Sequence, residues 1–423
     1  MPEAIGPDAD DYSDPAVIRA YVRHPDAPDV LRRKCLVVGS KGSGKSFFLK
    51  HQQLAHHPSA HLLKLPTDLS AVAGDLGIGG RSEQIAPARA TSIRGKTAAL
   101  LAATVLKQAA ERNNNAVDPY IVNIFLPGHS SDISGKVDAR RAGQIKRDLN
   151  RMPLEEWTHS PELDLMQDFA QGVRDLSGSP PIFLLDRGED ISAPALEVLM
   201  KLLDQSIPGI TAIAARPAIQ QLVPDVPNLT MQPGDHYDVV HLGTDPYGET
   251  WRSFVQDATR NYFELNDINA PGLADLTWTR NLARDSIKWA ISYTHIALQT
   301  PERRDIERRR DHMKILRDTA ESRARTILTN LVDIRRIVHE VRQRVPATTN
   351  GPQIAIDIQL GDFPEQLSLM GGRTRNERMI QAGLRAEAFY ILPATSWHPY
   401  EVPNCVEISP LLAWDGSNKK WIE

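Results

Sequence analysis

Short runs of apolar residues recur along the first 245 positions of the chain, and most of them end in glycine or charged residues. Such runs occur at residues 35–38, 60–65, 182–185, 210–215 and 239–243. Runs of about four to eight apolar residues are typical of parallel strands that are buried on both faces. Between them, residues 98–112 and 163–176 carry apolar side chains three or four positions apart, which predicts helices. Strands that alternate with helices predict an α/β fold with a parallel sheet flanked by helices.

From residue 246 onward the apolar spacing is mainly helical. Residues 250–265, 273–298 and 323–345 all show this spacing, which predicts a helical, lid-like domain after the sheet. Residues 347–352 end in Asn-Gly-Pro and are typical of a linker. Beyond the linker, a helical stretch at 375–383 and strands at 353–359, 388–392 and 405–408 resemble a winged-helix module.

The chain therefore divides into four parts. We expect an N-terminal lead-in at 1–30, a core with the parallel sheet at 31–245 and a helical insert at about 66–179, a helical lid domain at 246–346, and a small α+β, winged-helix-like domain at 347–423. Within the lead-in, Asp14 and Pro15 predict the start of a short helix with Val17, Ile18 and Tyr21 on one face.

Composition narrows the class of protein. The chain has 423 residues, of which 41% are hydrophobic and 24% are charged, which is ordinary for a globular protein of several domains. No apolar stretch approaches the length of a membrane span and the first residues are acidic, so we expect a cytoplasmic protein without a membrane partner. The two cysteines, Cys35 and Cys405, do not suggest a disulfide framework.

A phosphate-binding pattern follows the first apolar run. Residues 39–46 read Gly-Ser-Lys-Gly-Ser-Gly-Lys-Ser and match GxxxxGK[ST] at every fixed position. In this pattern the glycines let backbone N–H groups approach the phosphates, the lysine contacts the phosphate oxygens, and the last hydroxyl binds Mg²⁺. The sequence thus predicts a site for a nucleoside triphosphate. The residues expected to contact it are Gly39, Ser40, Lys41, Gly42, Ser43, Gly44, Lys45, Ser46 and Phe47, with Ser46 also on the metal.

Acidic residues follow the apolar run at 182–185. Asp186 ends this run, and a buried parallel strand would deliver its carboxylate to Mg²⁺ opposite Ser46. Hydrolysis also needs a carboxylate that the metal does not hold, and either Glu189 or Asp190 is expected to polarise the attacking water. The next apolar run ends in Arg216, a candidate sensor of the γ-phosphate because ligands bind at the carboxyl ends of parallel strands.

These three segments together resemble a family. The loop at 39–46, the strand that ends in Asp186-Arg187-Gly188-Glu189-Asp190 and the strand that ends in Arg216-Pro217 resemble the signatures of STAND and NACHT-type ATPases and of origin-recognition-like AAA+ ATPases. The resemblance covers about residues 31–243. It implies a P-loop NTPase fold of the additional-strand (ASCE) class, ATP and Mg²⁺ as ligands, and a molecular switch in which ATP hydrolysis controls conformation or assembly into a homo-oligomer.

The resemblance also bears on the catalytic acid. It assigns the activating role to Glu189, with Asp190 as the alternative. The chain departs from the pattern of many AAA+ proteins at Arg187, because there the catalytic glutamate directly follows the metal-binding aspartate. We therefore expect slow ATP turnover.

Basic residues suggest where a partner binds. Residues 301–345 carry thirteen Lys or Arg against eight Asp or Glu, in a chain whose net charge is −4. Such an excess is compatible with a surface for DNA or an acidic protein, whereas the interspersed acids favour a solvated, salt-bridged helix. We expect the C-terminal half to engage DNA or a partner protein, as in a bacterial defence or mobile-element system. One of these arginines, or Arg140 or Arg141 in the insert, is a candidate arginine finger.

Two other functions are compatible with the same nucleotide site. A P-loop phosphotransferase (kinase) would pass the γ-phosphate to a small substrate held by the insert, but it would not need a lid and a winged module. A protein that binds ATP with negligible hydrolysis would also need the loop, and Arg187 beside Asp186 keeps this alternative open.

Overall fold

The structure is a computed structural model of the chain. It describes residues 9–39, 42–72, 87–113, 137–157, 162–188, 191–215, 234–242, 249–268 and 291, together with five short strands between residues 357 and 421.

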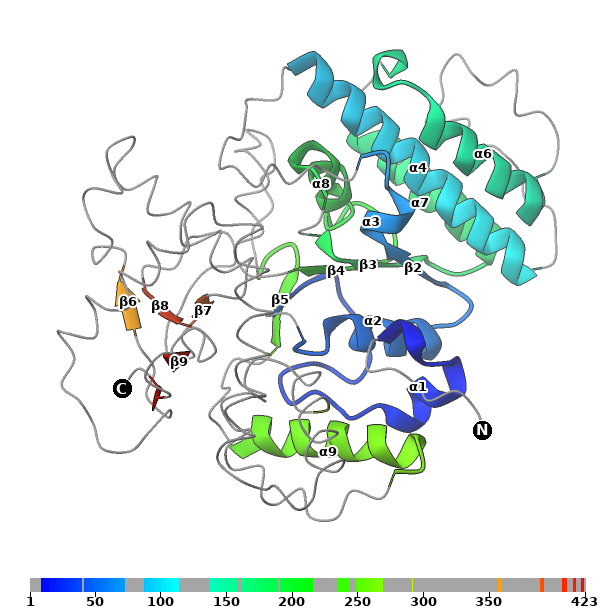
Figure 1. The fold of residues 1–423 in the computed structure, drawn as a ribbon. Coiled ribbons are helices and arrows are strands. Elements are labelled where there is room, and N and C mark those ends of the chain that lie inside the picture. Colours follow the sequence, from blue (N-terminus) through cyan, green and yellow to red (C-terminus); the bar gives the residue numbers. More distant parts are fainter. Residues whose placement is uncertain are drawn as a thin grey trace.

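A five-stranded parallel sheet forms the centre of this fold (Figure 1). Its strands are β1 (Cys35–Gly39), β2 (Ala60–Lys64), β3 (Ile182–Asp186), β4 (Ile210–Ala215) and β5 (Asp238–Leu242), in the spatial order β2-β3-β4-β1-β5. All neighbouring strands run parallel. The predicted α/β class and the five predicted strands are thus confirmed, and β1 and β3 are buried along their whole length, as a sheet covered on both faces requires.

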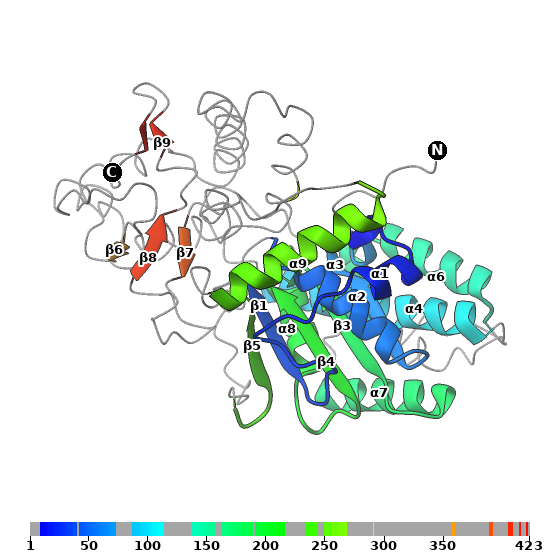
Figure 2. The ribbon, with the colours of Figure 1, turned by 90° about the horizontal axis from the view of Figure 1, so that it is seen from below.

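Helices cover both faces of the sheet. On one face lies α2 (Lys45–Ala55), with α1 (Asp14–Ala20) and α9 (Glu249–Leu265) packed beyond it, as Figure 2 shows from below. The opposite face is covered by α3 (Leu65–Asp68), α4 (Pro87–Asn113), α6 (Ala139–Arg151), α7 (Leu163–Ser177) and α8 (Ala193–Lys201). Two short 3-10 helices, η1 (Ala9–Asp11) and η3 (Leu154–Glu156), complete this part of the chain.

Most of these helices agree with the sequence pattern. The predicted helices at 98–112, 163–176 and 250–265 correspond to α4, α7 and α9, although α4 begins earlier, at Pro87. The predicted helix after Asp14 is present as α1, but Ile18 does not share its buried face. Its side chain is 63% exposed while that of Val17 is fully buried, because successive helix positions differ by about 100° in direction.

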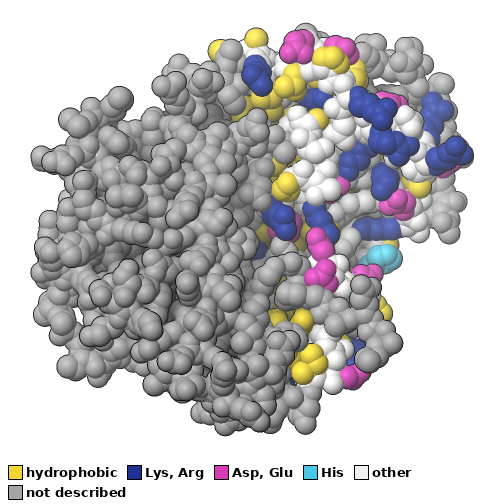
Figure 3. All heavy atoms as spheres, in the orientation of Figure 1, with side chains coloured by type: hydrophobic (Ala, Val, Ile, Leu, Met, Phe, Trp, Pro, Cys, Tyr) yellow, Lys and Arg dark blue, Asp and Glu magenta, His cyan; other side chains and the backbone are white. Residues whose placement is uncertain are grey.

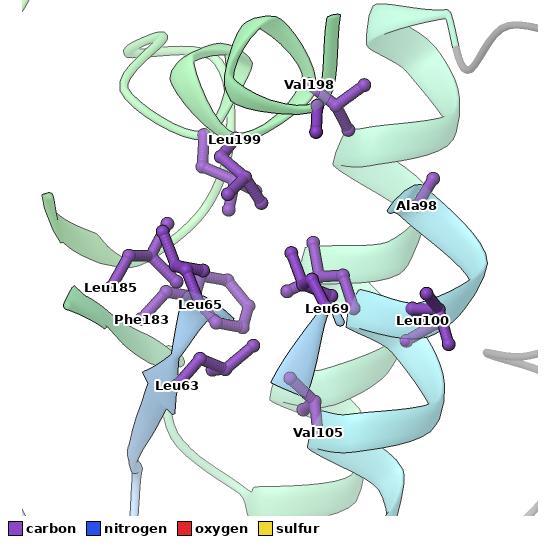
Figure 4. Close-up of a cluster of buried hydrophobic side chains, with 14 of the residues drawn as sticks. Leu63, Leu65, Leu69, Ala98, Leu100, Val105, Phe183, Leu185, Val198 and Leu199 are labelled. Atoms are coloured by element: carbon purple, nitrogen blue, oxygen red, sulfur yellow. The ribbon is translucent and has the colours of Figure 1, made fainter. Parts of the chain in front are cut away.

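The larger hydrophobic core lies between the sheet and the α4–α8 layer. Figure 4 shows Leu63, Phe183 and Leu185 projecting from β2 and β3 toward Leu100 and Leu199 of the helices, and all five are fully buried. A second cluster on the α2 face contains the alternate strand residues, including Ile182 and Leu184 of β3. Because strand side chains alternate between faces, Asp186 belongs to the α2 face of the sheet.

Side chains of α4 cover the outer edge of β2, which is an edge strand. Gln108 Nε2 donates to the carbonyl oxygen of Leu62 at 2.7 Å, and Arg112 Nη1 donates to the carbonyl oxygen of Ala60. The N–H of Lys64 donates to Asp68 Oδ2 at 2.8 Å. These bonds occupy strand groups that would otherwise be available for pairing with another chain.

The C-terminal region is described only as short strands. β6 (Asp357–Gln359), β7 (Phe389–Ile391) and β8 (Cys405–Ile408) form an antiparallel sheet in the order β6-β8-β7, and β9 (Trp414–Asp415) pairs with β10 (Lys420–Trp421). The first three fall where strands are predicted. The helical stretches predicted at 273–298, 323–345 and 375–383 lie outside the described residues, apart from Ile291, so the lid and the winged helix stay predictions.

Within the described residues, no helix has the length and apolar composition that a bilayer crossing requires.

Candidate functional site

The glycine loop connects β1 directly to α2. β1 ends at Gly39 and α2 begins at Lys45, with Gly44 as its N-cap residue. Gly42 and Gly44 have φ angles of 80° and 93°, in the left-handed region that residues with a Cβ rarely adopt. The tight turn into the helix therefore explains both glycines. Ser40 and Lys41 lie outside the described residues.

Gly39 is needed for a different reason, which is close packing. A Cβ atom at this position would lie 2.5 Å from Ser43 Oγ and 2.9 Å from the carbonyl oxygen of Leu242 in β5. The serine side chain can rotate away, but the backbone of the neighbouring strand cannot. Glycine at position 39 thus allows the end of β1 to pack closely against both β5 and the loop that follows.

Lys45 points back across the loop. Its side chain is buried, and its Nζ donates a hydrogen bond to the carbonyl oxygen of Gly39 at 2.7 Å. Ser46 and Phe47 follow in the first turn of α2 and are half-buried. The N-terminal end of a helix carries a partial positive charge, so the ammonium group and the helix end together favour an anion at this place.

The register of the sheet places Asp186 at the carboxyl ends of the strands, where the glycine loop also lies. β3 pairs with β4 so that Leu185 lies opposite Ile213, and β4 pairs with β1 so that Ala214 lies opposite Val37. Asp186, one position after Leu185, is therefore level with Val37, two residues before Gly39. With one strand between them, β1 and β3 are about 10 Å apart.

Asp186 and helix α2 also share one face of the sheet. The aspartate is the last residue of β3 and is 6% exposed. The N-terminus of α2, with Lys45 and Ser46, lies at the carboxyl end of β1 because the connecting loop is short. Lys45, Ser46 and Asp186 thus all lie at the carboxyl ends of the strands and on the α2 face of the sheet. A ligand shared through a metal ion requires this arrangement.

In comparisons with known proteins, no protein-family model and no curated protein matches this chain. The function therefore has to be inferred from the chemistry of the site residues.

The structure describes the strand ends that precede the residues expected to perform hydrolysis, but not those residues themselves. Arg187, directly after Asp186, has a φ angle of 63° and an exposed side chain, so the chain turns sharply at the end of β3. Glu189 and Asp190 lie outside the described residues, as does Arg216. The strand that precedes Arg216, β4, ends between β1 and β3. The role of each of these three residues stays a prediction.

Lys64 belongs to the same edge, and the sequence pattern gives no reason to single it out. It is the last residue of β2 and pairs in register with Asp186. Its ammonium group forms an ion pair with Asp10 of η1. One turn into α2, Lys50 Nζ donates to the carbonyl oxygens of Ala9, at 3.1 Å, and of Tyr12. Two lysines thus hold the N-terminal segment beside the candidate site.

Aromatic side chains attach α1 to the start of α2. The ring of Phe47 packs edge-on against Tyr12 at a centroid distance of 5.0 Å and stacks with Tyr21 at 6.5 Å. Tyr21 in turn stacks on His51 at 3.5 Å. Burial raises the pKa of Tyr21 to about 12, so its hydroxyl stays protonated at neutral pH. Phe47, which we expect beside the nucleotide, is thereby held in a fixed orientation.

Proposed function

We propose that the protein is an ATP-binding and slowly ATP-hydrolysing molecular switch of the additional-strand P-loop class. The observation that carries the proposal is that the glycine loop, Lys45 and Asp186 lie at the carboxyl ends of the strands and on the same face of a parallel sheet. The position of β4 between β1 and β3 supports the class, because its name refers to an additional strand between the loop strand and the strand with the metal-binding acid.

Each described site residue has a role in this proposal. The loop N–H groups and Lys45 bind the β- and γ-phosphates of ATP, and the Ser46 hydroxyl and the Asp186 carboxylate hold Mg²⁺. These donors fit the ion, since Mg²⁺ prefers oxygen ligands and is commonly bound by one or two carboxylates together with phosphates. When bound, Mg²⁺ neutralises charge on the phosphates.

Hydrolysis is assigned to residues that follow the strands. Glu189, or Asp190 as the alternative, polarises the attacking water, and Arg216 responds to loss of the γ-phosphate. Because Arg187 occupies the position directly after Asp186 and its side chain is exposed, no acid stands immediately beside the metal-binding residue, which agrees with slow turnover.

The remaining parts of the chain give the switch its output. In this proposal residues 246–346 form the lid that responds to the nucleotide, and the C-terminal half engages DNA or a partner protein. ATP then favours assembly into a homo-oligomer in the cytoplasm. Transfer of the γ-phosphate to a small substrate, and ATP binding without hydrolysis, are the competing outcomes.

The test is Mg²⁺-dependent ATP binding and turnover by the full-length protein and by the Asp186→Asn, Glu189→Gln and Asp190→Asn variants. We expect Glu189→Gln to bind ATP as the wild type does and to lose turnover by about 100-fold or more. Asp186→Asn should weaken the Mg²⁺ dependence of ATP binding. Unchanged hydrolysis in Glu189→Gln would move the activating role to Asp190.

Size-exclusion chromatography with ATP and with ADP tests the switch. A larger particle with ATP than with ADP supports it. A wild-type protein that does not bind ATP in the presence of Mg²⁺ would refute the proposal as a whole.

A further inference from the structure

Among the helices that the structure describes, α6 has the highest proportion of basic residues. Its thirteen residues include five Lys or Arg and one acid, whereas the whole chain has a net charge of −4. Figure 3 shows Lys and Arg side chains gathered over the region that α4 and α6 occupy in Figure 1. The charge is therefore concentrated on one part of the surface, far along the chain from the basic stretch at 301–345.

Three arginines form a line along the outer side of α6. Arg140, Arg147 and Arg151 are seven and four positions apart, so on a helix of 3.6 residues per turn they fall within about 40° of arc. All three are exposed, while Ala142 and Leu149 on the opposite side are buried in the core. The line extends over roughly 16 Å of the helix axis.

The outward arginines differ from the inward lysine in their partners. Lys146 faces the protein and forms an ion pair with Asp68 at 2.6 Å. Among the residues that the structure describes, Arg140, Arg147 and Arg151 form no ion pair, and Arg147 Nη2 donates instead to the neutral Gln144 at 2.7 Å. The one acid of α6, Asp148, accepts a hydrogen bond from Gln144 Nε2 at 2.7 Å, so three positive charges stand against one negative charge on the exposed side of the helix.

We propose that the outward face of α6, defined by Arg140, Gln144, Arg147 and Arg151, binds the phosphate backbone of duplex nucleic acid. A guanidinium group matches the geometry of a phosphate and can donate two hydrogen bonds to it. Gln144 has a second amide N–H beside the one that it donates to Asp148, and amide side chains commonly add phosphate contacts. The contact requires no base reading, so the binding is independent of sequence.

The composition of this face selects among polyanions. It has no apolar side chain, whereas a helix that binds at a membrane surface needs an apolar face, and the buried core of a stable protein interface is largely apolar and depleted of charge. It has no aromatic side chain either, and single-stranded nucleic acids are usually held by stacking on aromatic rings. A duplex backbone is the polyanion that needs only a line of positive charge.

The experiment compares two triple variants of the full-length protein. One carries Arg140→Gln, Arg147→Gln and Arg151→Gln, and the control carries Arg89→Gln, Arg174→Gln and Arg260→Gln. The control removes the same charge from exposed positions on α4, α7 and α9. Binding of a short random-sequence duplex DNA is measured by fluorescence anisotropy, without nucleotide, at salt concentrations from about 50 to 200 mM.

We expect the α6 variant to bind the duplex at least about tenfold more weakly than the wild type at low salt. Since each lost phosphate contact lowers the slope of log affinity against log salt by about 0.9, the slope should fall by roughly 2 to 3. The control should stay within about threefold of the wild type. Circular dichroism melts verify that both variants are folded.

Three results would overturn the proposal. One is equal affinity and salt slope in the wild type and the α6 variant, which includes the absence of duplex binding by the wild type. Another is equal loss in both variants, because net charge alone would then explain the effect. The third is stronger binding of single-stranded DNA, an acidic peptide or anionic vesicles than of the duplex. Because no nucleotide is present, these results do not depend on whether the protein is an ATPase.

The α6 arginines also allow a test against the arginine-finger role. If Arg140→Gln alone abolishes ATP turnover while duplex affinity stays unchanged, Arg140 acts on a neighbouring subunit and the duplex proposal is wrong for that residue. Weaker duplex binding by Arg140→Gln supports the proposal for that residue, whatever its effect on turnover.

Discussion

The Nζ atom of Lys45 lies 2.7 Å from the carbonyl oxygen of Gly39 and donates a hydrogen bond to it. This bond joins the first residue of α2 to the last residue of β1 and so closes the glycine loop. An ammonium group has three N–H donors, so Lys45 can contact phosphate oxygens while this bond orients it. The bond thus fixes the ammonium group over the loop, where we propose that the phosphates bind.

Replacement of Lys45 by alanine should therefore weaken ATP binding. Loss of a charge-assisted contact to phosphate costs more than about 1.5 kcal/mol, or roughly tenfold in affinity, and the loop also loses its closing bond. Isothermal titration calorimetry with Mg²⁺-ATP measures the change. Lys107→Ala is the matched control, because Lys107 lies on α4 and forms an ion pair with Glu111 in the next turn at 3.0 Å. An affinity of Lys45→Ala within about twofold of the wild type would show that the loop does not hold the phosphates.

Replacement of Gly39 by alanine should destabilise the fold. The added Cβ would lie 2.9 Å from a backbone oxygen of β5, and overpacking of this kind costs about 1 to 3 kcal/mol. The control is Gly143→Ala in α6, where the nearest atoms would be 3.7 Å away. Alanine favours a helix over glycine, so Gly143→Ala should be as stable as the wild type or more stable. Urea denaturation gives both free energies of unfolding, and equal values for the two variants would contradict the packing role of Gly39.

Lys34 should be essential for stability even though it lies at the opposite end of the sheet from the candidate site. It is 4% exposed, and its Nζ donates to the carbonyl oxygens of Leu202, at 2.9 Å, Ile207, at 2.7 Å, and Asp204. Burial lowers the pKa of Lys34 to about 8. Lys34→Met removes the donor shared by the carbonyls of Leu202 and Ile207, while that of Asp204 still accepts the N–H of Ile207. The free energy of unfolding should fall by about 2 to 4 kcal/mol.

The neighbouring arginine provides the control for Lys34. Arg33 has a side chain that is largely exposed and lies 4.0 Å from Asp238, so Arg33→Met should change the stability by less than about 1 kcal/mol. Thermal or urea denaturation checks both variants. A Lys34→Met protein as stable as Arg33→Met would mean that water replaces the ammonium group among the carbonyls.

His61 should make the fold sensitive to acid. Burial, together with the positive charge of Arg112, lowers the pKa of His61 to about 3. The unfolded chain takes up this proton near pH 6.5, so stability is full above that pH and falls as the pH decreases toward 3. In His61→Leu this loss is absent, and between pH 7 and 4.5 the variant should lose roughly 2 kcal/mol less than the wild type. If the unfolding free energies of the wild type and of His61→Leu changed equally with pH, His61 would not titrate in this window.

The strands and the glycine loop are predictable because their signals are local. A run such as residues 182–185 is apolar at every position, and the phosphate pattern occupies eight consecutive residues. The sequence pattern does not predict α6, because its inward face consists largely of Ala142, Gly143 and Leu149, which give a weak apolar stripe. Helix α8 is short and mostly apolar, so its periodicity is hard to distinguish from that of a buried strand.

The composition of the site is less accessible from sequence. Asp186 can be recognised because it ends an apolar run, but its level relative to Val37 depends on the register of three strands. Lys64 becomes a neighbour of Asp186 only through the pairing of β2 with β3. Its partner Asp10 is more than fifty positions away, and no periodic pattern connects the two.

Asp68 joins two parts of the molecule through a single carboxylate. One of its oxygens accepts the N–H of Lys64 at the end of β2, and the other accepts the ammonium group of Lys146 in α6. Neither the strand end nor the helix can shift relative to the other without stretching one of these bonds. The insert is thus mechanically coupled to the strand end that flanks Asp186, and a load on α6 would be transmitted to that edge within two hydrogen bonds.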